Sequence, residues 1–192
     1  MRTFISRRRA VMLAALPFAI VAASVTASAS EDAAWTALRA GGIALFRHAN
    51  APGGGDPEAF RLNDCATQRN LDDAGRRQAS RIGEAFRARG VAVGRVLTSQ
   101  WCRTRETAEF AFPGQMQDEP AFNSFFEDRS RGPAQVAAAI GVLQSWRGPG
   151  ALFVSTHQVN ITSLTGIVPV SGEGVVVTLD GGALRVIGRI NP

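Results

Sequence analysis

The two histidines of the chain each stand at the end of a short apolar run, and this placement constrains the fold most. Residues 43–46 (IALF) lead into Arg47 and His48, and residues 151–156 (ALFVST) lead into His157. Apolar runs of this length, bounded by glycine, are typical of buried parallel strands. Residues just past the carboxyl ends of such strands converge on one crevice of an open α/β sheet. The sequence therefore predicts that Arg47 and both histidines face one pocket, suited to holding and attacking a phosphoryl group.

Helices are predicted between these strands. Asp72 fits an N-cap and Gly90 a C-cap residue for one of them. The expected helices cover residues 31–40, 73–89, 102–110 and 133–146, and the expected further strands cover residues 91–98, 173–180 and 183–190, the last two as a hairpin. Residues 51–57 predict a loop, and residues 112–132 a mostly irregular segment. This alternation favours a three-layer α/β/α sandwich with a mostly parallel central sheet.

The first 29 residues have the pattern of a cleaved export signal. Four arginines precede an apolar stretch over residues 10–25, and residues 27–29 (ASA) fit the small-x-small rule for cleavage. Cleavage there would leave one domain, residues 30–192. The alternative is an uncleaved anchor, but Pro17 and the small residues after it favour processing, so no stable membrane insertion is expected. Residues 6–8 (SRR) resemble a twin-arginine signal, which leaves both the general and the twin-arginine export routes open.

The charge of the chain depends on this leader. Of the 21 basic residues, four lie before residue 30, which leaves 17 basic against 16 acidic residues in the expected mature domain and reduces the formal net charge from +5 to +1. The chain has no lysine, and its remaining arginines are scattered along the sequence. A nucleic-acid partner is therefore not predicted.

Cys65 and Cys102 are the only cysteines. Behind an export signal, an even count predicts one disulfide, and the expected location is the periplasm or the outside of the cell. A zinc site built from these cysteines and the histidines is the alternative, but no close ligand pair such as C-x-x-C supports it, so no metal is predicted.

Four stretches in order resemble motifs of the histidine phosphatase superfamily, which has the phosphoglycerate mutase-like fold. They are residues 45–50 (LFRHAN), with Ala49 in place of the family's glycine, and residues 68–79 (QRNLDDAGRRQA), 98–108 (TSQWCRTRETA) and 154–157 (VSTH). The resemblance covers most of the expected mature domain. It implies a phosphoglycerate mutase-like sandwich and an exported small phosphatase of this superfamily, of the histidine acid phosphatase type.

The resemblance implies a role for each motif residue. His48 would be the nucleophile that takes the phosphoryl group onto nitrogen, while Arg47, Arg103 and His157 would bind the phosphoryl oxygens. Guanidinium groups suit this task because they donate paired hydrogen bonds to the equatorial oxygens. They also disfavour the protonated form of a nearby imidazole, which attacks only when neutral. Asn50 follows the nucleophile and is a further candidate for phosphate binding. No cofactor is implied.

The proton donor for the leaving group is less defined. Residues 125–129 (FFEDR) place Glu127 and Asp128 beside aromatic residues. Burial of a carboxyl group near these rings would raise its pKa into a range useful for a proton donor, and Glu127 is favoured over Asp128. An ion pair of either carboxylate with Arg129 or Arg131 is the structural alternative.

Three polar residues remain ambiguous. Arg69 could support the helix start or bind substrate, and Asn160 and Thr162 could bind a ligand or cap a short helix.

The sequence thus predicts an exported phosphomonoester hydrolase that acts on a small phosphorylated substrate. The alternatives are a non-catalytic protein that binds phosphate or a phosphoconjugate, and a phosphomutase. Residues 51–57 and 112–132 are expected to set the substrate specificity.

Overall fold

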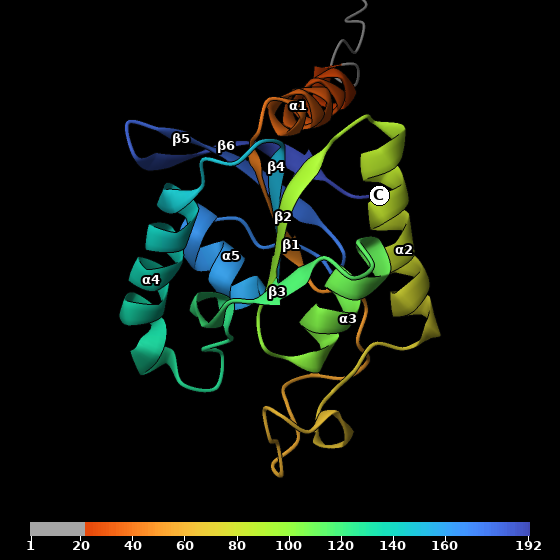
Figure 1. The fold of residues 1–192 in the computed structure, drawn as a ribbon, viewed down its shortest axis with the longest axis vertical. Helices are drawn as coiled ribbons and strands as arrows, with labels where there is room; N and C mark the ends of the chain where they lie inside the picture. The colour runs from red at the N-terminus through yellow and green to blue at the C-terminus, as the bar shows by residue number, and fades with distance from the viewer. Residues whose placement is uncertain (1–21) are drawn as a thin grey trace, which may run out of the picture.

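Six strands form one mixed sheet at the centre of the molecule, whose computed structural model describes residues 22–192 (Figure 1). The strands are β1 (Ile43–Arg47), β2 (Val93–Thr98), β3 (Met116–Asp118), β4 (Ala151–Thr156), β5 (Gly174–Asp180) and β6 (Ala183–Ile190). Their order in the sheet is β3-β2-β4-β1-β5-β6. The first four strands in this order are parallel, and β5 and β6 form an antiparallel hairpin beside β1.

Within residues 22–192, five α-helices cover the two faces of this sheet. They are α1 (Ala22–Arg39), α2 (Asp73–Ala88), α3 (Cys102–Ala111), α4 (Gly132–Ser145) and α5 (Gln158–Thr165). Figure 1 shows α2 and α3 on one side of the sheet and α4 and α5 on the other. The predicted three-layer α/β/α sandwich is therefore confirmed.

Alternate residues of the buried strands feed two separate apolar cores, because successive side chains of a strand point to opposite faces. Ala44 and Phe46 of β1 pack into a core with side chains of α1, α2 and α3. Ile43 and Leu45 pack into the other core, with side chains of α4 and α5. Phe153 is at the centre of the first core, where its ring stacks on Phe46 with 5.0 Å between centroids.

The pairing of β1 with β4 places the two histidines at the same edge of the sheet. The two strands are parallel, with Arg47 opposite Thr156, and the His48 N–H donates to the Thr156 carbonyl across 2.9 Å. His48 directly follows β1, and His157 directly follows β4. This position at the carboxyl end of parallel strands is the one that the apolar runs predicted.

Most predicted elements agree with the structure to within two residues at each end, and β4 agrees at both ends. Two predictions were incomplete. The helix expected over residues 31–40 is the second part of α1, which begins at Ala22. The segment over residues 112–132 contains the edge strand β3, whose three residues are all exposed and so carry no alternating apolar pattern.

The predicted export signal over residues 1–29 lies mostly outside the described residues, and its cleavage stays a prediction. None of the helices in the described part of the chain has both the length and the apolar character that a membrane crossing requires.

Gly83 sets how closely α2 and α3 pack. A Cβ at Gly83 would lie 2.0 Å from the Ala111 carbonyl oxygen at the end of α3, whereas a Cβ at Gly141 in α4 would meet nothing within 4 Å. Alanine in a helix is favoured over glycine by about 1 kcal/mol when space is free. We therefore expect Gly141→Ala to raise the free energy of unfolding by up to ~1 kcal/mol and Gly83→Ala to lower it, because the backbones must separate.

Urea unfolding of both variants beside the wild-type protein measures this difference. An increase in stability for Gly83→Ala would contradict the close approach of α2 to α3.

Candidate active site

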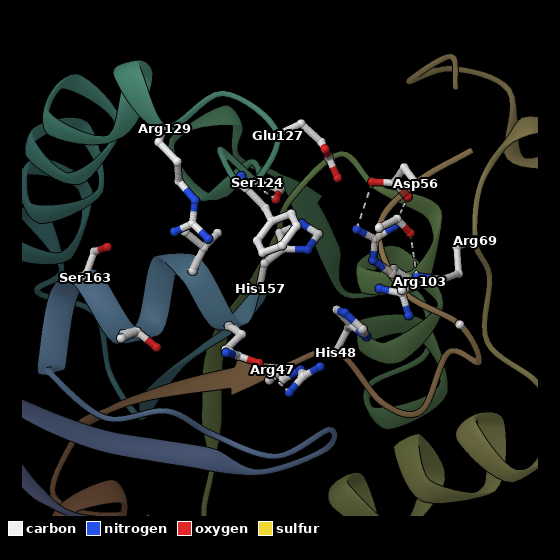
Figure 2. Close-up of a pocket in the computed structure, with 17 residues that line it drawn as sticks. Arg47, His48, Asp56, Arg69, Arg103, Ser124, Glu127, Arg129, His157 and Ser163 are labelled. Carbon is white, nitrogen blue, oxygen red and sulfur yellow. Dashed lines mark hydrogen bonds and ion pairs between the residues drawn. The ribbon is translucent and has the colours of Figure 1, made fainter. Parts of the chain in front are cut away.

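A cavity of about 310 Å³ opens at the carboxyl edge of the parallel strands, a size suited to a small-molecule ligand (Figure 2). Four groups predicted from the sequence line it together, namely Arg47, His48, Arg103 and His157. The residues that complete its wall come from the segments on either side and from α5, and they are Gly53, Gly54, Gly55, Asp56, Arg69, Ser124, Phe126, Glu127, Arg129, Gln158, Val159, Thr162 and Ser163.

His48 is buried and held in one tautomer. Its Nδ1 lies 2.8 Å from the Ala49 carbonyl oxygen. Since a carbonyl only accepts, Nδ1 carries the proton and Nε2 keeps its lone pair. Burial, and then the positive charge of Arg103, lowers the pKa of His48 to about 3. The imidazole is therefore neutral at physiological pH, with Nε2 free for nucleophilic attack.

His157 lies against His48, with ring centroids 5.7 Å apart. Its Nε2 is 2.7 Å from the Ser99 hydroxyl, which leaves Nδ1 as the ring nitrogen available to a ligand. Burial, and then Arg103, lowers the pKa of His157 well below its usual value. If the Ser99 hydroxyl donates to Nε2, the single proton of the neutral ring is on Nδ1, where it can donate to a phosphoryl oxygen.

Arg47 and Arg103 each have a buried Nε that finds no hydrogen-bond partner among the described residues. Arg47 is the last residue of β1, and its Nη1 donates to the Gln158 side chain and to the Pro169 carbonyl. Arg103 is in the first turn of α3 and is 4% exposed. A half-buried guanidinium (Arg47) and a buried one (Arg103), each with a buried Nε–H that has no partner among residues 22–192, lie beside two neutral imidazoles and form a site for an anion with several oxygens.

A segment between β1 and α2 closes the cavity from one side. It begins with the glycine-rich loop (residues 51–57) and lies near the start of α3, at the bottom of Figure 1. Arg69 lines the cavity and also holds this loop, because its guanidinium donates to the Gly55 carbonyl across 2.9 Å and to the Ala51 carbonyl.

The predicted disulfide is present between Cys65 and Cys102, with 5.7 Å between the Cα atoms. It links the segment that follows the glycine-rich loop to the residue before Arg103. The pairing overturns the alternative of a zinc site on these cysteines, and the described residues contain no cluster of three or more His, Cys, Asp or Glu side chains with metal-binding geometry.

The two carboxylates considered as proton donor have different surroundings in the structure. Glu127 lines the cavity that contains His48. Asp128 instead caps the turn over Arg129–Arg131, where it accepts from the Ser130 N–H and hydroxyl. The expectation that Glu127 is buried among aromatic residues is wrong, because its side chain is exposed and the neighbouring Phe126 is 53% exposed.

Asn50, predicted to touch phosphate, is not among the residues that line the cavity. Its side chain donates to Asp72, the N-cap residue of α2, so its position supports the start of this helix instead. Asn160 and Thr162 lie within α5 and do not cap it. The Asn160 side chain donates to the Asn123 carbonyl, whereas Thr162 lines the cavity.

Ala49, which replaces the family's glycine, is accommodated without strain. Its side chain is fully buried in a small cluster with Ala51, Leu71 and Ala79. Among residues 22–192 only glycines have a positive φ, so the backbone at Ala49 needs no glycine.

Several residues that support the site were missed from the sequence. Thr107 accepts from the Ala49 N–H, and Gln78 accepts from the Asn50 N–H, so both fix the chain just after His48. Both residues and Ser99 lie inside the quoted motifs, which was the available signal. Asp56 was missed entirely, although it was the only acidic residue of the glycine-rich loop.

The two neutral histidines predict how stability depends on pH. A histidine in an unfolded chain takes up a proton near pH 6.5. The native state does not protonate His48 until about pH 3. The contribution of each histidine to the free energy of unfolding is therefore fully present above pH 6.5. It is lost as the pH falls below this value, by about 1.4 kcal/mol per pH unit for each histidine.

Urea unfolding between pH 6 and 4.5 tests this pH dependence. We expect the slope for His48→Asn to be shallower than that of the wild-type protein by about 1.4 kcal/mol per pH unit. In the double variant with His157→Asn, the slope should be reduced by roughly twice this amount, since the chain has no other histidine. Equal slopes for all three proteins would show that neither imidazole is held neutral.

Comparisons with known proteins agree with this geometry. The sequence profile of the histidine phosphatase superfamily (branch 1) matches residues 43–135, which include Arg47, His48 and Arg103. No curated protein sequence matches the chain.

Solved structures of similar fold include the protein histidine phosphatase SixA complexed with tungstate, at 18% identity and a TM-score of 0.56 over 79% of this chain and 97% of that one. A protein from Nakamurella multipartitia, proposed to be the phosphohistidine phosphatase SixA, gives 17% identity and a TM-score of 0.56 over 79% and 96% of the two chains. An Escherichia coli protein proposed to be an alpha-ribazole-5'-P phosphatase gives 18% identity and a TM-score of 0.55 over 77% of this chain and 96% of that one. At these identities the structures support the fold. The profile match over residues 43–135 and the arrangement of Arg47, His48 and Arg103 make this chain similar to the histidine phosphatase superfamily (branch 1).

Proposed function

We propose that this chain is an exported phosphatase that hydrolyses a small phosphomonoester through a phosphohistidine intermediate on His48. The observation that carries the proposal is a neutral, buried His48 whose Nε2 has no partner among residues 22–192, beside two arginines whose Nε groups have none there either. A nucleophile and an oxyanion site in one cavity are the two requirements of phosphoryl transfer.

In the first step, Nε2 of His48 attacks phosphorus in line with the leaving oxygen. The N–P bond forms as the P–O bond breaks, and Arg47, Arg103 and His157 stabilise the charge on the equatorial oxygens. Glu127 gives a proton to the leaving alkoxide. In the second step the Glu127 carboxylate takes a proton from water, the water oxygen attacks phosphorus, and the N–P bond breaks to release phosphate and neutral His48.

Two features support turnover and export. A carboxylate, Glu127, lines the same cavity as His48, and a protein that only binds phosphate has no need of it. A disulfide persists in oxidising compartments such as the periplasm, which agrees with the export signal proposed for residues 1–29.

The covalent intermediate can be trapped. Brief incubation of the purified protein with labelled phosphomonoester, followed by rapid quenching, should leave acid-labile and base-stable phosphate on His48. His48→Asn should carry no label and show no turnover. Because SixA is described as a protein histidine phosphatase, the substrate panel should include a phosphohistidine peptide beside alkyl and aryl phosphates. Label on serine or aspartate would contradict the mechanism.

The role of Glu127 can be separated from that of its neighbour. Glu127→Gln should slow hydrolysis of alkyl phosphates by roughly 10²- to 10⁴-fold, the usual contribution of a general acid. Aryl phosphates should be affected much less, because their leaving groups hardly need a proton. Asp128→Asn is the matched control and should keep wild-type rates, since Asp128 caps a turn. Equal effects on both substrate classes would exclude Glu127 as the acid.

A further inference from the structure

Asp56 pairs with Arg103 inside the proposed active site (Figure 2). The Arg103 Nη1 lies 2.5 Å from Oδ1 of Asp56, and Nη2 lies 3.1 Å from Oδ2. The indole N–H of Trp101 donates to Oδ2 across 2.9 Å. The side chains of Arg103 and Asp56 are only 4% and 10% exposed. Although burial opposes it, the hydrogen bond from Arg103 lowers the pKa of Asp56, so the carboxylate is ionised.

This pairing uses only one edge of the guanidinium. An arginine has five N–H groups, and a carboxylate that binds Nη1 and Nη2 end-on engages one hydrogen of each. The Nε–H and the adjacent Nη hydrogen remain as a second edge that can bind two oxygens of a phosphoryl group. In Arg103 this Nε is buried and has no partner among residues 22–192.

Arg47 follows the same arrangement with neutral acceptors. Its Nη1 donates to Gln158 across 2.8 Å and to the Pro169 carbonyl across 3.0 Å, while its Nε is buried without a partner in the described chain. Both arginines are thus held by protein acceptors at Nη and have a free Nε–H. In Arg103 the holding group is a carboxylate.

Asp56 is itself fixed in place, which argues against a group that leaves when substrate binds. Arg69 holds the carbonyl of the preceding residue, Gly55. Phe60 stacks on Trp101 with 5.3 Å between ring centroids. Further along the segment, the disulfide joins Cys65 to Cys102, directly before Arg103.

We propose that Asp56 is a positioning residue that acts through Arg103, holding the guanidinium so that its Nε edge faces the phosphoryl oxygens. This inference rests on the proposed phosphatase function and extends it to a residue outside the four motifs. Orientation matters because a donor stabilises the transition state only where the charge develops, and a displacement of about 1 Å can cost 10²-fold in rate.

The test compares Asp56→Asn with Glu58→Gln, which removes the same charge from an exposed position two residues away. Turnover of p-nitrophenyl phosphate and the Kd for tungstate are measured for both. Asp56→Asn should lower kcat by roughly 10- to 100-fold with a smaller change in KM, and should not tighten tungstate binding. Glu58→Gln should match the wild-type protein in both.

A double-mutant cycle shows whether the effect passes through Arg103. Lysine carries a compact charge without two donor edges, so in the Arg103→Lys background the Asp56→Asn change should alter kcat by less than about 2-fold. The same loss in both backgrounds would show that Asp56 acts independently of Arg103.

Two further results would overturn the proposal. An unchanged kcat for Asp56→Asn would remove the positioning role, and tighter tungstate binding with a higher kcat/KM would show that Asp56 competes with phosphate. Should Asp56→Asn not fold, Asp56→Glu keeps the charge and lengthens the side chain. Positioning predicts a lower kcat for it, and a purely structural ion pair predicts no change. A wild-type protein without turnover or tungstate binding would instead refute the proposed function.

Discussion

The parallel pairing of β1 with β4 is the constraint on which the site depends. It sets Arg47 opposite Thr156, so His48 and His157 leave the sheet side by side although 108 positions of sequence lie between them. The pairing is fixed from both faces, because a shift of one residue would exchange the side chains that fill the two cores. Apolar packing far from the cavity therefore sets the distance between the imidazoles.

Burial then determines the charge state of the site. His48 and His157 are surrounded by protein and by the guanidinium of Arg103, so both stay neutral. The same surroundings would make an unpaired arginine costly. Arg103 is paired with Asp56, a carboxylate from a segment that contributes to neither of the two large cores. One low-dielectric environment thus keeps His48 unprotonated and requires a counter-ion for Arg103.

The sequence predicted the strands and the groups at their ends because these depend on local patterns. The run over residues 151–156 is entirely apolar or small, and it is bounded by glycine and histidine. Both ends of β4 were therefore predicted correctly. The short strand β3 has no such pattern, because its three residues are exposed, and it is recognised only by its pairing with β2. The partnership of Asp56 with Arg103 spans 47 positions and could not be inferred without the fold. Asn50 was misplaced for a related reason, because its partner Asp72 lies across the same irregular segment.

The walls of the cavity and the cores of the domain are built from different parts of the chain. None of residues 53–60 or 123–131 belongs to either large apolar cluster, yet these two segments supply many of the residues that line the cavity around His48 and Arg103. At the exposed positions of these segments, which exclude Asp56, substitutions change few of the contacts that set the free energy of unfolding. Evolution can therefore alter the shape and polarity of the cavity wall while Arg47, His48, Arg103 and His157 stay in place, so that one fold can accommodate different ligands at little cost in stability.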